Sequence, residues 1–225
     1  SVKPEAMPDA GRLSAAPTAV AARLGTGLAV MPGIEIRSAG DLALNDDWNL
    51  FSDFADAREG TLTLRAGGNL AIRGHLSDGF DAADRSGLLQ TGGSRNLRLG
   101  AGGDLGSPDG LAPTPLAAQA AGKGSIVVGT ANTAVPSEGE PAPENGAGKQ
   151  VRTGTGDLDL RAGRDLVLAH KESVVYTAGR RDTTEWSDFT TANPNARYGV
   201  EGGNLAIAAQ GSIEAAPSNQ HFTEW

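Results

Sequence analysis

Pairs of acidic residues are the first feature of this sequence that could support catalysis. The candidate pairs are Asp46 with Asp47, Asp53 with Asp56, and Asp157 with Asp159. Cleavage of a glycosidic bond needs two carboxyl groups held at a fixed separation across one cleft. Asp157 and Asp159 instead alternate with Leu158 and Leu160, so on a strand they share the face opposite the leucines. We interpret this alternation as the solvated face of a half-buried strand and predict no catalytic residue.

A column of polar residues follows a short apolar segment at several places along the chain. Its members are Asp41, Asn69, Asp104 and Asp165. Stacked carboxylates could bind Ca²⁺, but the Gly-Gly-x-Gly-x-Asp run of calcium-binding β-rolls is missing. Side-chain capping of the turn backbone is the expected role, because Asp and Asn hydrogen-bond readily to nearby N–H groups. We predict no metal site and no cofactor.

Other reactive patterns are also weak. The histidines His75, His170 and His221 lack the spacing of metal ligands, and the chain has no cysteine. Neither a nucleophile elbow nor a phosphate-binding loop occurs. Arginines recur after the apolar segments at Arg37, Arg65 and Arg161. Acidic neighbours offset them, so a solvated face is favoured over an anionic-glycan site.

Aromatic residues gather in two polar stretches and are the candidates for partner binding. Aromatic rings stack on sugars and anchor protein partners, but they also pin loops onto a protein surface. Pinning of the loop is the favoured interpretation for both stretches, including Phe54 of the first. The possible partner-binding residues are Trp48, Phe51, Trp186, Phe189 and Tyr198.

Composition excludes several classes of protein. The 225 residues carry a net charge of -8, which argues against nucleic-acid binding because such proteins usually present a basic surface. An apolar run long enough to cross a membrane is missing. The first residues do not resemble a signal peptide, so we expect a piece of a longer protein. Gly is abundant, at 32 residues, and bulky apolar residues are sparse. The chain therefore has few large side chains with which to fill a wide hydrophobic core.

An internal repeat explains this composition. The pattern is apolar-x-apolar, a Gly-containing corner that often ends in Asp or Asn, and again apolar-x-apolar. Its copies begin near residues 34, 62, 97, 126, 158 and 205, the fourth being only a half-copy. Alternation with period 2 predicts strands, and Gly with Asn or Asp suits tight corners. Narrow stacked rungs need few bulky side chains.

We therefore predict an all-β, right-handed parallel β-helix, a β-solenoid with irregular lateral loops. A β-sandwich with short strands is the alternative, which the recurring corner disfavours. Residues 1–27 are expected to be a poorly patterned lead-in, and residues 28–225 a single β-helix domain. Residues 106–150 are expected to form a long Pro/Gly/Ala-rich loop region around a strand at 126–128. Residues 180–199 are expected to form a polar aromatic loop.

The repeats resemble those of the filamentous haemagglutinin-like large exoproteins over about residues 30–215. The stretches that carry the resemblance are residues 32–42, 62–70, 156–166 and 173–180. It implies a parallel β-helix within a long fibre, exported from a Gram-negative bacterium by two-partner secretion through an outer-membrane transporter barrel. The family's secretion domain carries Asn-Pro-Asn motifs near its N-terminus. Asn193-Pro194-Asn195 matches only superficially, so we interpret it as a turn.

The function that the resemblance implies is a non-enzymatic stalk of a secreted surface adhesin. Such a stalk would project binding or effector regions toward a host or neighbouring-cell receptor or glycan, for adhesion or contact-dependent interaction. The alternative is a polysaccharide-binding or polysaccharide-degrading β-helix protein. The expected location is the cell surface or the exterior of a Gram-negative bacterium, without a membrane span and without nucleic acid as a partner.

Overall fold

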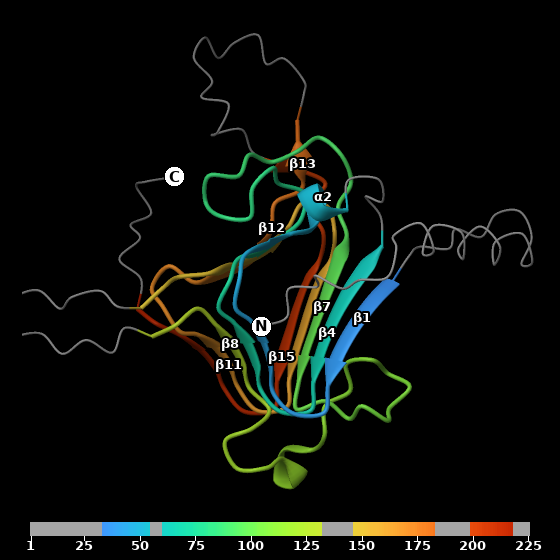
Figure 1. The fold of residues 1–225 in the computed structure, drawn as a ribbon, viewed down its shortest axis with the longest axis vertical. Helices are drawn as coiled ribbons and strands as arrows, with labels where there is room; N and C mark the ends of the chain where they lie inside the picture. The colour runs from blue at the N-terminus through green and yellow to red at the C-terminus, as the bar shows by residue number, and fades with distance from the viewer. Residues whose placement is uncertain (1–32, 55–59, 132–145, 183–198, 218–225) are drawn as a thin grey trace, which may run out of the picture.

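The computed structural model describes residues 33–54, 60–131, 146–182 and 199–217. Within these ranges the chain is mostly β-strand, and its strands form three parallel sheets (Figure 1). Helix is confined there to one turn, α2 (Leu50–Asp53), and to the 3-10 segment η1 (Leu116–Ala118). The predicted all-β class is confirmed.

The three sheets, here called A, B and C, are traversed in a fixed order. Sheet A contains β1 (Gly33–Ser38), β4 (Thr61–Ala66), β7 (Asn96–Ala101), β10 (Leu158–Ala162) and β15 (Leu205–Ala209). Sheet B contains β2 (Leu42–Leu44), β5 (Leu70–Ile72), β8 (Ile126–Val128), β11 (Leu166–Leu168) and β16 (Ile213–Ala215). Sheet C contains β3 (Trp48–Asn49), β6 (Leu76–Ser77), β9 (Gln150–Thr153) and β12 (Val174–Thr177).

Each passage of the chain through sheets A, B and C makes one rung, and the rungs stack in sequence order. Equivalent residues of successive rungs pair directly, as in Ile34 with Leu62 and Leu62 with Leu97. This strict register fixes which side chains face inward, because a slip of one residue would turn every side chain to the other face. A short antiparallel pair, β13 (Arg180–Arg181) with β14 (Gly199–Val200), lies outside the three sheets.

The third rung differs from the sequence prediction. The copies beginning near residues 97 and 126 are two parts of one rung, because Ile126 pairs with Leu70 and Leu166 in sheet B. The predicted second strand at Asp104-Leu105 does not form. Instead residues 102–125, here called the A-side loop, separate β7 from β8, and residues 129–149 separate β8 from β9. Residues 132–145 of the second segment lie outside the described part of the chain.

The core is a set of apolar ladders between the sheets. Leu62, Leu97 and Leu158 form one ladder in sheet A, each at most 1% exposed. Burial of one such side chain stabilises the fold by about 1.5–3 kcal/mol. Two or three inward residues per strand are enough for so narrow an interior, which explains the low content of bulky apolar residues. Exposure rises at the last rung, where Leu205 is 45% and Ile213 is 60% exposed.

Candidate functional site

The predicted corner residues form hydrogen bonds between rungs rather than within their own turns. At the corner between sheets A and B, the Asp41 side chain accepts a hydrogen bond from the backbone N–H of Asn69 at 2.8 Å. The Asn69 side chain accepts from Ser125 N–H at 3.0 Å, and Asp165 accepts from Ser212 N–H at 2.8 Å. Ser125 thus takes the place that the sequence analysis gave to Asp104. Asp104 caps its own loop by accepting from Gly106 N–H.

The other two corners carry shorter ladders of the same kind. Between sheets C and A, the side chain of Asn96 accepts from Asp157 N–H, and Asp157 accepts from Asn204 N–H. Between sheets B and C, Asp47 accepts from His75 N–H at 2.8 Å. Asp157 therefore links the third and fifth rungs to its own through hydrogen bonds at this corner.

The largest polar cluster lies under residues 78–95, here called the strap, which connect β6 to β7. The strap begins with a tight turn at Gly79, whose φ of +79° favours glycine. An added Cβ there would lie 2.8 Å from the backbone of Gly154, so a larger residue does not fit. The cluster beneath the strap contains the buried polar residues His75, Ser77, Asp78, Arg95, Gln150 and Arg152.

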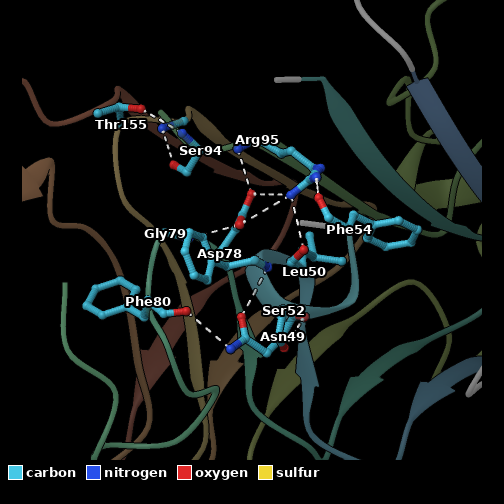
Figure 2. A network of polar contacts seen from close by, with 12 residues as sticks. Asn49, Leu50, Ser52, Phe54, Asp78, Gly79, Phe80, Ser94, Arg95 and Thr155 are labelled. Atoms are coloured by element: carbon cyan, nitrogen blue, oxygen red, sulfur yellow. Dashed lines mark hydrogen bonds and ion pairs between the residues drawn. The ribbon is translucent and has the colours of Figure 1, made fainter. Parts of the chain in front are cut away.

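Asp78 and Arg95 form a buried ion pair that joins the two ends of the strap (Figure 2). Asp78 Oδ2 lies 3.2 Å from Arg95 Nη1 and accepts the Arg95 backbone N–H at 2.7 Å. Arg95 also donates to the carbonyls of Leu50 and Phe54, at 3.1 and 2.6 Å. Burial raises the pKa of Asp78 above its ordinary value, although its hydrogen bonds with Arg95 oppose that shift.

Arg152 holds the middle of the strap against sheet C. Its guanidinium lies 3.7 Å from the centroid of the Phe80 ring and donates to the carbonyls of Ala82 and Asp84 at 2.8 and 2.5 Å. It also donates to Ser77 Oγ at 2.9 Å and to Tyr176 Oη at 3.1 Å. Because all these contacts engage one cation, Arg152 is an organising residue rather than a free binding group.

His75 and Gln150 complete the cluster at the corner between sheets B and C. His75 Nδ1 accepts the backbone N–H of Gln150 at 3.2 Å, which requires an unprotonated Nδ1. Burial lowers the pKa of the His75 imidazole, and the positive charge of Lys149 adds to this effect. Gln150 Oε1 is buried and is the only buried side-chain N or O atom without a hydrogen-bond partner among the described residues.

One of the aromatic candidates, Trp48, is placed differently from the prediction. Trp48 is only 3% exposed and points into the core of the first rung, so it is not a lateral-loop residue. Its position in β3 pairs with the core residue Leu76 of β6, which explains the burial. Phe51 is half-buried in α2. Trp186, Phe189 and Tyr198 lie outside the described residues.

Two arginines of the column, Arg65 and Arg161, form ion pairs with acidic groups. Arg65 is buried and pairs with Glu35 at 2.8 Å, and it donates to the carbonyl of Asp104 in the A-side loop. Arg161 pairs with Asp159 and with Asp109. The hydrogen bonds that Arg161 donates to Asp159 raise the pKa of Arg161. Arg37 remains exposed at the first rung.

A groove of about 340 Å³ lies between the A-side loop and the last strand of sheet A. Pro113, Asp159, Arg161 and Gln210 line it, together with residues 206–209 of β15. The charges at its wall are already paired, which weakens attraction for an acidic ligand.

The described ranges contain no group of three or more His, Asp or Glu side chains able to hold a metal ion. Nor does any helix within them have the length and apolar character needed to cross a bilayer. Searches of protein-family models, of curated proteins and of solved structures found no match to this chain.

The strap cluster was missed by the sequence analysis, since Arg95, Gln150 and Arg152 stand in no recognised motif. The available signal was the Asp78-Gly79 dipeptide directly after a short apolar strand, which marks a turn. Nothing local in the sequence indicates that the following residues fold back over sheet C.

Proposed function

We propose that this chain is a non-enzymatic stalk segment of a secreted bacterial surface adhesin, folded as a right-handed parallel β-helix. The observation that carries the proposal is the in-register stack of three parallel sheets, with apolar ladders inside and hydrogen-bond ladders at the corners. A stack of this kind resists bending, because each rung is fixed to the next through sheets A and B and, over the first four rungs, also through sheet C. The handedness follows the strong preference of parallel strand connections.

The resemblance of the repeats to filamentous haemagglutinin-like exoproteins supports the extracellular role. The transporter that such a stalk requires is an outer-membrane barrel, and the target of the complete adhesin is a receptor or glycan on another cell. The stalk's own contribution is mechanical. The paired state of Asp157, Asp159 and Arg161 favours this role over polysaccharide cleavage.

The proposal is tested by presenting the purified chain to a glycan array and to acidic polysaccharides, with an assay for chain cleavage. A stalk binds no glycan specifically and releases no oligosaccharide. Specific binding that a matched variant such as Phe51→Ser abolishes would favour a glycan-binding module instead. Release of cleavage products would favour a polysaccharide-degrading enzyme.

Export is tested separately in the source cell. The chain, within its native protein, is expected outside the cell only when a partner transporter barrel is present. Export that persists after deletion of every such barrel would contradict the two-partner route.

A further inference from the structure

The strap is held down at its two ends and at its middle by different residues. The ends are joined by the Asp78–Arg95 pair. The middle depends on Arg152, which binds the carbonyls of Ala82 and Asp84. An exposed ion pair between Arg85 and Glu172 adds a peripheral contact at 2.9 Å. Arg152 is therefore the buried side chain that binds the middle of the strap to sheet C.

Arg152 is positioned by β9, and the first residue of β9 is bound to His75. The Gln150 N–H that His75 Nδ1 accepts belongs to the strand residue two before Arg152. His75 itself is fixed from the preceding rung, because its backbone N–H donates to Asp47. His75 thus forms one link between the second rung and the start of β9.

The charges around His75 do not favour a positive charge on its imidazole ring. Lys149 and Arg152 face it from the third rung, Asp47 faces it from the first rung, and Asp84 faces it from the strap. Two positive and two negative groups balance each other while the imidazole is neutral. Lys149 and Asp47 are already paired at 3.5 Å.

We propose that His75 is an acid-sensitive latch, which keeps the strap closed over sheet C while its ring is neutral and releases it when the ring is protonated. Protonated Nδ1 carries a hydrogen and can no longer accept from Gln150 N–H. The new charge also repels Lys149 and Arg152, which weakens the contact of Arg152 with the strap. Release uncovers Ser77 and Tyr176, which lie under the closed strap, and separates them from Phe80 of the strap itself.

The direction of the pH effect follows from the burial of the ring. The closed state lowers the pKa of His75 below 6.5, so it binds a proton less readily than the open state does. Closure is therefore favoured above about pH 6.5 and is lost as the pH falls below that value.

Hydrogen–deuterium exchange of the complete chain tests the latch, with rates corrected for the intrinsic effect of pH. Between about pH 7.5 and 5.5 we expect protection of residues 79–94 to fall with the pH, by at most about tenfold per pH unit. Protection of β4 and β7 should stay well above that of the strap at every pH, as expected for a local opening. His75→Asn supplies an amide oxygen that accepts near the Nδ1 position but does not titrate, so it should abolish the response.

His170→Asn is the matched control. His170 is also buried and accepts a backbone N–H through Nδ1, but that donor is Glu172 of its own turn. The response should persist in this variant. The latch is overturned if strap protection in the wild type is independent of pH, or if His75→Asn responds as the wild type does. If His75→Asn fails to fold, an NMR titration decides: strap opening that does not follow the His75 ring titration also overturns the latch.

Discussion

Arg95 and Asp78 clamp the two ends of the strap through a side-chain ion pair of 3.2 Å and a backbone-to-carboxylate hydrogen bond of 2.7 Å. Both side chains are almost completely buried, at 7% and 1% exposure. The pair closes a loop between the second and third rungs, and Arg95 also donates to the carbonyls of Leu50, the first residue of α2, and of Phe54, its C-cap residue. One arginine therefore connects three segments distant in sequence.

Removing Arg95 should strongly destabilise the fold. Arg95→Met leaves the Asp78 carboxylate buried without its cation, and we expect a loss of about 3–5 kcal/mol in the free energy of unfolding. The double variant Asp78→Asn/Arg95→Met should lose less than the sum of the single variants, since it removes both charges. Chemical denaturation monitored by circular dichroism measures these values.

The matched control is Arg98→Met. Arg98 faces Asp109 at 3.7 Å on the exposed side of sheet A, so its loss should cost less than about 1 kcal/mol. Equal costs for Arg95→Met and Arg98→Met would show that the buried pair has no special role.

The corner ladder should contribute measurably to stability. Asp165→Ala removes the acceptor of the Ser212 N–H, and we expect a cost of about 0.5–2 kcal/mol. Asp104→Ala is the comparison, because the Asp104 side chain accepts from Gly106 N–H within the same A-side loop. Urea denaturation of both variants measures these costs. If the corner ladder stabilises the fold, Asp165→Ala loses more free energy of unfolding than Asp104→Ala. A larger loss for Asp104→Ala would argue against it.

Trp48 should behave as a core residue. Trp48→Ala opens a cavity beside the first-rung leucines, with an expected cost of about 3–5 kcal/mol. Phe51→Ala, at a half-buried position in α2, should cost less. Thermal denaturation of both variants provides the measurement. If Trp48→Ala leaves the melting temperature unchanged, the assignment of Trp48 to the core is wrong.

Global stability should decrease under mild acid because of His75. Its pKa is lowered in the folded state, mainly by burial, so the unfolded chain binds the proton more readily. Stability is then fully present above about pH 6.5 and declines below it. Asp78 acts in the opposite sense at lower pH, because its raised pKa means that the folded state takes up that proton more readily.

Urea midpoints of the wild type and His75→Asn, measured from about pH 7.5 to 5.5, separate the histidine's effect from the rest. The difference between the two proteins should change across this range. A constant difference would mean that the His75 ring does not titrate differently in the folded and unfolded chains.

The strands were predictable because a short sequence pattern within each strand and its corner determines them. Leu62 and Leu64 alternate with outward residues, and each pair is followed by Gly and a polar corner residue. The parallel stacking followed from recurrence of this unit. Which residues form the third rung was not predictable. Asp104-Leu105 matches the local strand pattern as well as Ile126 does. The place beside Leu70 in sheet B is taken by Ile126, so no strand forms at Asp104-Leu105.

The polar cluster was hidden for a similar reason. Gln150 and Arg152 occupy outward positions on β9, where sequence patterning predicts solvent exposure. They are buried because the strap, encoded far earlier in the chain, folds over them. Trp48 was misplaced because a two-residue strand such as β3 is too short to show alternation.

Force spectroscopy on a single molecule tests the central claim, that this chain is a mechanically resistant stack of rungs. With the chain held near Ile34 and Leu205, the account predicts discrete force peaks whose spacing matches the rungs. The rung from Ile34 to Leu62 should release about 100 Å of contour length, and the one from Leu97 to Leu158 about 210 Å. Smooth extension without force peaks, or steps unrelated to these lengths, would contradict it.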